Sequence, residues 1–459
     1  MTRRPGYTEG PVGRLMVASA FPMLAGTLSI SGYNIVDTYF VGQLGRIPLA
    51  AMGYTFPVVM FIGCIYHGLG GGATTPVAQY LGADRRRDAA RIVSSATMLV
   101  LLAGLIIGVA GIFSIDFIFP RLGATPQVMP DIRRYMWIWY LGSTVNALSM
   151  MGNHLLISGG TPRLAGMMML FGMGLNALLD PVFISGWGIV PGMGVAGAAL
   201  ATVLAQGVSL SLLFLILHFR LRLIEAPWRI SREQLLAAWR VIARYGIPAM
   251  LGMVLNPIGM GVVTFAVSRT GGDLAVAATN AAGRLEGIAF IFPMSLGMTL
   301  LPMVAQNFGA KRFDRINECR RFAMRFAGIF LAVMSVLYFV LAPDLAALFV
   351  KDAEVAAMMA RYLRIIVWGF AAIEIHRYST FFFTGTGHPL AAAVLNLARV
   401  IAFMVPLTLA AMALHSLNGV FAARLVADLA SGTIGCLLAA RLTHRFVASP
   451  SAPAKEVRP

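Results

Sequence analysis

Two aspartates in strongly apolar surroundings are the residues of this chain best suited to do chemistry. Asp37 lies in an otherwise uncharged run from about Leu15 to Val41, and Asp180 lies in a similar run later in the chain. A charge at the centre of a bilayer costs roughly 2.5–3.5 kcal/mol on insertion scales, so an intramembrane acid needs a partner or a function. Burial disfavours the charged carboxylate, and a nearby second carboxylate disfavours double ionisation. We predict that the two acids face each other across a membrane cavity and exchange a cation.

Each aspartate has a polar residue four positions before it, which lies on the same face of a helix. Tyr33 precedes Asp37 in this way, and Asn176 precedes Asp180. The alternative to cation exchange is a static polar clamp, in which Asn34 or Asn176 merely satisfies the neighbouring acid.

The elements that position these acids are membrane-spanning helices. The chain is 58% hydrophobic and only 12% charged, whereas a soluble domain is typically about 25% charged. Twelve apolar runs are long enough to cross a bilayer: 15–41, 49–75, 92–119, 132–157, 164–188, 194–218, 237–267, 274–304, 322–349, 355–384, 390–414 and 418–441. The sequence therefore predicts an all-α polytopic membrane protein with twelve transmembrane helices.

The net charge of +17 follows the positive-inside rule better than it suggests a nucleic-acid partner. Lysines and arginines concentrate in alternate loops and in both tails, as in the Arg85-Arg86-Arg87 loop. Those loops and both termini are therefore predicted to be cytoplasmic, in a multi-pass protein of the bacterial inner membrane. The three cysteines have no metal-ligand spacing and no sign of a disulfide framework, so we interpret them as packing residues.

An internal repeat divides the chain. Val77-Ala78-Gln79 recurs as Val304-Ala305-Gln306, and each copy ends a span before a basic loop. The repeat predicts a six-helix half over 1–218, a connector over 219–236, a second half over 237–445 and a tail over 446–459. An even number of spans per half makes the repeats parallel, related by a pseudo-twofold axis along the membrane normal. Because Val263 stands at the position equivalent to Asp37, the fold can be built without the acid, which favours a functional role over the clamp.

Other ionisable residues fall inside predicted spans of the second half. Glu286 shares a span with Arg284, and Glu374 lies three residues before Arg377. Both acids are functional candidates by position, although the nearby arginines could neutralise them. Arg424 and Asp428, four apart, are interpreted as a structural ion pair, and Arg399 has no evident partner in the sequence.

Motifs spread over almost the whole chain, from about Arg14 to Arg445, resemble those of the multidrug and toxic compound extrusion (MATE) family. They are Pro22, Tyr33-Asn34, Asp37, Val41-Gly42-Gln43-Leu44-Gly45, Gly82-Ala83, and Leu175-Asn176 leading to Asp180-Pro181. The resemblance is closest to the DinF-like branch. It implies a protonation site in the N-terminal half that comprises Tyr33, Asp37, Asn153, Asn176, Asp180 and Thr202.

The resemblance also marks a departure in the second half. In the NorM-like branch, acids on the seventh and tenth helices form a cation site, but here Asn256 takes the approximate place of the seventh-helix glutamate. Glu374 lies near the place of the tenth-helix acid. The candidates for the substrate cavity are accordingly Glu374, Glu286, Asn34 and Asn256.

The expected function is secondary active export of cationic or amphiphilic organic compounds, such as drugs or toxic organic cations, in exchange for protons. There are two alternatives: a sodium-coupled drug antiporter, and a flippase of the same superfamily that moves a lipid-linked precursor. The chain shows no HExxH motif, nucleophile elbow or Walker A motif, so neither an enzyme nor an ATP-driven pump is expected. We expect no cofactor other than the coupling ion, no metal, no nucleic-acid partner, and a monomer in the lipid bilayer.

Overall fold

The computed structural model describes residues 6–226 and 230–448, apart from the side chains of Ile30, Ser31, Asn34, Val447 and Ala448. Within these ranges the chain forms helices and no named strand. In order they are α1 (Val12–Gly42), α2 (Arg46–Gly82), α3 (Arg86–Arg121), α4 (Met129–Ser158), α5 (Pro162–Ile184), α6 (Val195–Leu215), η1 (Ile216–Leu221), α7 (Arg232–Gly309), α8 (Phe313–Val340), α9 (Ala342–Phe349), α10 (Ala353–Ile366), η3 (Val367–Gly369), α11 (Phe370–Gly385), α12 (Pro389–Leu397), η4 (Ala398–Met404), α13 (Val405–Ala413) and α14 (Leu417–Ala448).

The helices account for the predicted number of membrane crossings. Ten helical stretches of the described chain are long and apolar enough to span a bilayer. One of them, α7, has 78 residues and is interrupted at Gly272 by a left-handed, non-helical conformation (φ 64°, ψ −166°), which glycine adopts without steric penalty. Its two arms match the predicted spans 237–267 and 274–304. The remaining predicted span is α4, whose 30 residues are long enough although more polar. The prediction of an all-α fold with twelve transmembrane helices is confirmed.

Two predicted spans differ from the structure in detail. The span predicted over 322–349 begins earlier, as α8, and ends in a separate short helix, α9. The span over 390–414 contains the π-helical turn η4 between α12 and α13. Pro406 follows that turn and has no backbone N–H to donate, so the wider turn accommodates its ring without a broken α-helical ladder.

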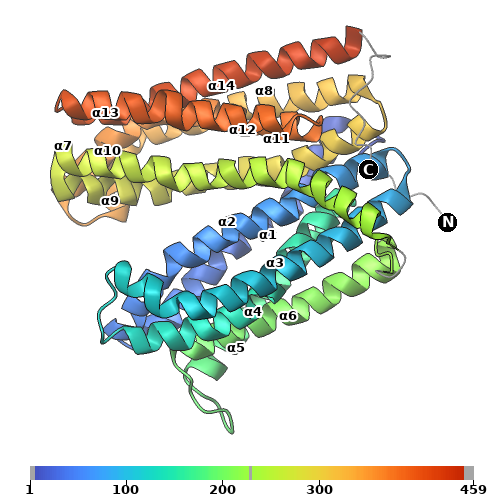
Figure 1. Ribbon diagram of the computed structural model, residues 1–459. Coiled ribbons are helices and arrows are strands. Elements are labelled where there is room, and N and C mark those ends of the chain that lie inside the picture. The colour runs from blue at the N-terminus through green and yellow to red at the C-terminus, as the bar shows by residue number, and fades with distance from the viewer. Residues whose placement is uncertain (1–5, 227–229, 449–459) are drawn as a thin grey trace. The chain divides into compact units, whose positions relative to one another are not determined.

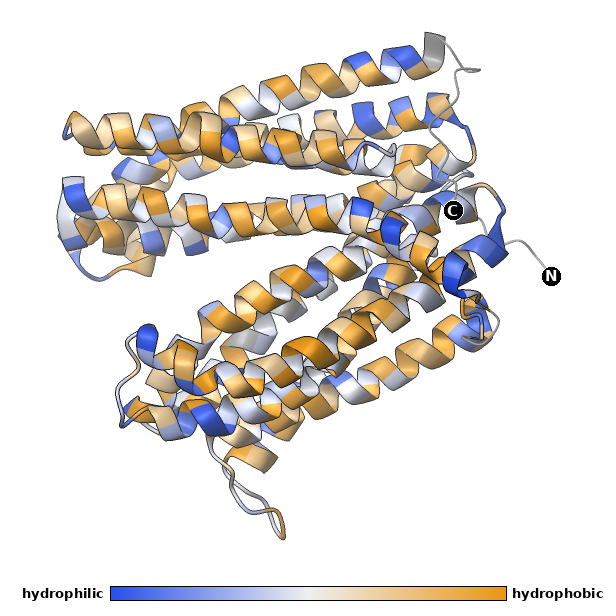
Figure 2. Cartoon of the chain, in the orientation of Figure 1, coloured by the Kyte–Doolittle hydropathy of each residue, from blue (hydrophilic) through white to orange (hydrophobic). Residues whose placement is uncertain are grey.

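The described chain divides into two compact units. The N-terminal unit comprises residues from Phe21 to Met250, and the C-terminal unit comprises residues from Leu251 onward together with those up to Ala20. The boundaries fall inside α1 and α7, so each of these two helices contributes residues to both units. Figure 1 shows the helices of each unit running side by side. Figure 2 shows apolar residues along the helices and hydrophilic residues mainly towards their ends. The predicted symmetry axis stays a prediction.

Glycines bring helix backbones into direct contact in the N-terminal unit. A Cβ atom added at Gly72 of α2 would lie 2.5 Å from the carbonyl oxygen of Ile242 in α7. A Cβ atom at Gly166 of α5 would lie 2.1 Å from the carbonyl oxygen of Pro22 in α1. Small residues at membrane helix interfaces permit this close approach. The second contact holds the first helix, which carries Asp37, against the fifth, which carries Asp180.

The N-terminal residues are fixed in the C-terminal unit by the second copy of the repeat motif. The backbone N–H of Tyr7 donates to Oε1 of Gln306 at 3.0 Å, and Nδ2 of Asn307 donates to the Tyr7 carbonyl at 3.1 Å. Arg315 adds a hydrogen bond from Nη1 to the carbonyl of Gly10 at 2.7 Å. The repeat motif therefore orders the residues that precede α1.

Candidate functional site

Asp37 and Asp180 lie together in the N-terminal unit. Asp37 is on α1, five residues before its end at Gly42, and Asp180 is on α5, four residues before its end at Ile184. Both acids are thus about 6–8 Å along the axis from a helix end. Their carboxylates are close enough to interact with each other, and Asp180 is fully buried.

Amide and hydroxyl groups surround this pair. Nδ2 of Asn176 donates to Oδ1 of Asp180 at 3.2 Å and lies 3.3 Å from Oγ1 of Thr202 on α6. Asn176 is also within hydrogen-bond reach of Asp37. Among the described residues, one oxygen of each acid, Oδ1 of Asp37 and Oδ2 of Asp180, is buried without a hydrogen-bond partner. The pair therefore has acceptor capacity that its described neighbours leave unused.

Tyr33 is held by residues that the sequence analysis did not single out. Nε2 of Gln206, on α6, donates to the Tyr33 hydroxyl at 3.3 Å. A Cβ atom at Gly172 of α5 would lie 2.6 Å from the same hydroxyl and 3.0 Å from Oγ of Ser209. Gln206 lies four residues after Thr202, so both belong to one face of α6. This four-residue spacing from Thr202 is the sequence signal that could have identified Gln206 as a site residue.

Tyr135 is a second residue that the sequence did not suggest. It is buried on α4 and close enough to both Asp37 and Asp180 to interact with them electrostatically. Asn153, on the same helix, donates through Nδ2 to the carbonyl of Ser149 at 3.1 Å. Its Oδ1 is buried without a partner in the described structure. The side chain of Asn34 lies outside the described residues.

The acids of the C-terminal unit have different neighbours. Arg424 of α14 donates to both oxygens of Glu286 on α7, from Nη2 at 2.6 Å and from Nη1 at 3.2 Å. The hydroxyl of Tyr362 on α10 donates to Oε1 of Glu286 at 2.9 Å. The predicted pair of Arg424 with Asp428 is present at 4.0 Å, but Glu286 is the closer partner. Because the arginine is bidentate, the geometry is that of a strong ion pair.

Arg399 has partners that no sequence spacing suggested. It lies in the π-helical turn η4 and donates from Nε to Oδ1 of Asp428 at 2.7 Å. Its Nη1 donates to Oδ1 of Asn256, an exposed residue of α7, at 3.0 Å. The side-chain oxygen of Asn256 is therefore hydrogen-bonded to the guanidinium of Arg399. Single π-helical turns are often found at functional positions.

Glu374 is fully buried on α11 and close to one arginine. Its Oε2 is 2.9 Å from Nη1 of Arg377, whose guanidinium lies 5.7 Å from the centre of the Phe290 ring. Neither oxygen of Glu374 makes a hydrogen bond with good geometry among the described residues. Its neighbour His376 pairs instead with Asn396, Nε2 to Oδ1 at 2.9 Å. The structure therefore separates Glu374 from the network of Glu286.

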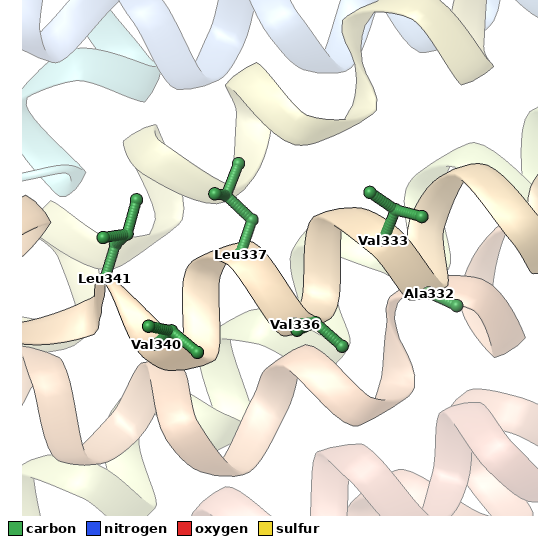
Figure 3. A pocket seen from close by; sticks show the side chains of 6 residues that line it. All are labelled: Ala332, Val333, Val336, Leu337, Val340 and Leu341. Carbon is green, nitrogen blue, oxygen red and sulfur yellow. The ribbon is translucent and has the colours of Figure 1, made fainter.

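Two further features lie apart from both groups of acids. His67 of α2 and His154 of α4 contact each other through Nδ1 and Nε2 at 3.2 Å. An apolar pocket of about 560 Å³ on α8 contains no candidate residue. Figure 3 shows its lining side chains along that helix, all of them aliphatic: Ala332, Val333, Val336, Leu337, Val340 and Leu341. In the described chain no group of three or more potential metal ligands comes together.

Known proteins of similar sequence are transporters. A FAD transporter of Shewanella oneidensis is 30% identical over 443 residues, covering 96% of this chain and 97% of that protein. The multidrug export protein MepA of Staphylococcus aureus is 26% identical over 446 residues, covering 95% and 96%. The crystal structure of the Vibrio cholerae MATE transporter VcmN in the bent form superposes with a TM-score of 0.88, at 26% identity and with 95% and 98% coverage.

A family model supplies the assignment. The model named MatE matches residues 22–182 and 248–409, one segment in each predicted half. The first segment contains both Asp37 and Asp180, and the second contains Glu286, Glu374 and Arg399. These segments make up more than half of the sequence, and the chain therefore belongs to the MATE family of efflux transporters.

Proposed function

We propose that this chain exports small molecules across the bacterial inner membrane in exchange for protons, which bind between Asp37 and Asp180. The observation that carries the proposal is the proximity of the two carboxylates, each of which has one buried oxygen without a hydrogen-bond partner among the described residues. Two carboxylates can share a hydrogen bond only when one of them holds a proton, because an ionised carboxylate is acceptor-only. Their proximity therefore favours a singly protonated pair, such as a DinF-like protonation site requires.

The surroundings of the pair support exchange rather than permanent neutralisation. Its described neighbours are an amide, a hydroxyl and two tyrosines, from Asn176, Thr202, Tyr33 and Tyr135. These groups orient the acids and leave their charge uncompensated. Loss of the proton therefore leaves two repelling carboxylates. During such a cycle the pair alternates between a singly protonated form and a doubly ionised form. The two carboxylates, on α1 and α5, repel each other in the second form.

The leading substrate class is cationic or amphiphilic organic compounds. MepA, the relative from Staphylococcus aureus, is named a multidrug export protein, and the two acids of the N-terminal unit suit a site that alternates between a proton and an organic cation. In this cycle, the proton enters as the substrate leaves. The proposal places both termini on the cytoplasmic side and treats the monomer as the transporting species.

A flavin dinucleotide is the second candidate substrate. The relative from Shewanella oneidensis is named a FAD transporter, and FAD carries a pyrophosphate that arginine recognises well. Arg284 is exposed on the second arm of α7, twelve residues after Gly272 and thus about 18 Å along the helix. A charged side chain at that depth faces water rather than lipid. This arginine gives an anionic substrate a partner within the membrane.

Transport in proteoliposomes tests coupling and substrate separately. The purified full-length chain is reconstituted, and either a pH gradient or a sodium gradient is imposed, with ethidium or FAD as the fluorescent substrate. We expect the pH gradient alone to drive transport, and Asp37→Asn to abolish it. Transport that requires sodium and ignores the pH gradient would overturn the proton assignment. Movement of FAD without ethidium, reduced by Arg284→Gln, would select the second substrate.

A further inference from the structure

The C-terminal unit contains a buried ionic network that the proposed transport cycle does not use. Two acids and two arginines form it: Glu286, Asp428, Arg399 and Arg424. They come from the second arm of α7, the π-helical turn η4 and α14. Their formal charges balance. Tyr362 and Asn256 complete the network with hydrogen bonds to Glu286 and Arg399, respectively.

Each acid in this network has its own guanidinium. Arg424 binds both oxygens of Glu286, and Arg399 places Nε and Nη2 each at 2.7 Å from Oδ1 of Asp428. Both acids are buried. A buried carboxylate must be neutralised by a partner, a proton or a bound cation. Here the neutralising partner is the guanidinium of an arginine side chain, which cannot dissociate from the protein.

The contrast with the N-terminal unit indicates what this network does. Among the described residues, no lysine or arginine forms an ion pair with Asp37 or Asp180, so under the proposed function these acids are neutralised by an exchangeable cation. An arginine is always charged in proteins. A site neutralised by arginine therefore keeps its charge whatever the ion composition of the surrounding water.

We propose that Arg399 and Arg424 are built-in counter-cations that keep the C-terminal unit from exchanging a free monovalent cation. They occupy the positions where a proton or an alkali ion would otherwise have to neutralise Asp428 and Glu286. Neither Glu286 nor Asp428 then needs an exchangeable ion. The π-helical turn contributes directly, because it carries Arg399 at the point where the guanidinium meets Asp428.

The proposal is tested by removing a guanidinium and asking whether a free cation replaces it. The variant Arg424→Met is purified, and its Tm is measured in sodium chloride and in choline chloride at equal ionic strength, and again at lower pH. The charged and titratable groups around Glu286 and its neighbour Asp428 come from four elements: Arg424 of α14, Tyr362 of α10, Tyr338 of α8 and Arg399 of η4.

We expect the Tm of Arg424→Met to rise by roughly 3–5 °C with sodium or with acid, as a bound ion stabilises the folded state. The protein with Arg424 intact should show neither the sodium response nor the acid response. Both proteins carry Asp37→Asn, so that any ion response of the Asp37–Asp180 site is the same in the two measurements. A response to sodium alone identifies an alkali-ion site, and a response to acid alone identifies a proton site. Either supports the proposal.

The matched control is the double variant Glu286→Gln with Arg424→Met, which removes acid and base together and should lose the ion response. If Arg424→Met does not fold, Arg399→Met decides, because Asp428 then retains Arg424 at 4.0 Å. A Tm that is independent of sodium and of pH in the folded variant overturns the proposal. Since the readout is stability, its failure is independent of whether protons drive transport.

Discussion

Asp37 and Glu286 are both acids on membrane-spanning helices, yet the two units of the molecule neutralise them differently. In the N-terminal unit, Asp37 lies against a second carboxylate, an amide and tyrosines. In the C-terminal unit, Glu286 is held bidentately by Arg424. The negative charge of the first group is neutralised only when a proton or another cation is present, whereas the charge of Glu286 is neutralised by Arg424 without one. The comparison teaches that an intramembrane acid is a candidate for ion exchange only when its counter-charge can leave.

The largest expected effect is the loss of transport in Asp37→Asn. The change keeps size and hydrogen bonding but fixes the neutral state, so the pair with Asp180 cannot alternate between charges. We expect efflux of a fluorescent cation to fall at least tenfold, with the Tm of the purified protein preserved or raised because an unpaired buried acid is removed. Efflux is measured in cells alongside the Tm.

Asp180→Asn is the matched variant, because the proposed protonation site consists of both acids. It should give the same loss of efflux with the same retained stability. A stable Asp37→Asn protein that transports at the wild-type rate would contradict the proposed function and remove the distinction between the two units.

The same chemical change in the C-terminal unit is expected to act on stability instead. Glu286→Gln leaves Arg424 with the Tyr362 hydroxyl and, as its acidic partner, the more distant Asp428. Breaking one partner of a buried ion pair typically costs about 3–5 kcal/mol. We expect a lower Tm and less folded protein. Efflux per folded molecule should remain near that of the wild type, measured by normalising transport to the amount of reconstituted protein. Normal stability with lost efflux would place Glu286 in the transport cycle.

The number and limits of the membrane helices could be predicted because they depend on local properties. Long apolar runs identify spans, and the run over 237–267 matches the first arm of α7 up to Gly272. The exceptions have local causes that hydropathy does not register. The π-helical turn before Pro406 and the short helix α9 both lie within runs that are apolar enough to be predicted as continuous spans.

The contacts between side chains were less accessible to sequence reasoning. The resemblance to the family motifs predicted that Asp37, Asp180 and Asn176 belong to one site. By contrast, Tyr135 of α4 has no spacing that links it to α1, and the spacing of Gln206 from Thr202 places it on a face of α6 without indicating its contact with Tyr33. Arg399 meets Asp428 from a helix that is distant in sequence. Charge alone could suggest pairing, but it could not choose among the acids, and for Arg424 the closer partner proved to be Glu286.

The hydrogen-bonding residues around each group allow a finer comparison. Asn176 is fully buried and contacts both Asp180 and Thr202. Asn176→Ala should lower efflux several-fold, because it removes the donor that orients Asp180, and should cost about 1–3 kcal/mol of stability for the unpaired groups left behind. The measurement is efflux against external pH. An unchanged pH profile would mean that Asn176 packs the site without influencing proton binding.

The smallest effect is expected at Asn256, although it takes the approximate place of an acid that belongs to the cation site of the NorM-like branch. Its side chain accepts a single hydrogen bond from Nη1 of Arg399, whose Nε and Nη2 remain bound to Asp428. Asn256 is also exposed, so its loss leaves Arg399 a route to water. Asn256→Ala should therefore cost at most about 1 kcal/mol and leave efflux unchanged, by the same Tm and transport assays. Asn256→Glu sharpens the comparison, because Arg399 would neutralise the new carboxylate and no sodium dependence should appear. Sodium-dependent efflux in that variant would show that the C-terminal unit can exchange an ion despite its arginines, and the contrast between the two units would fail.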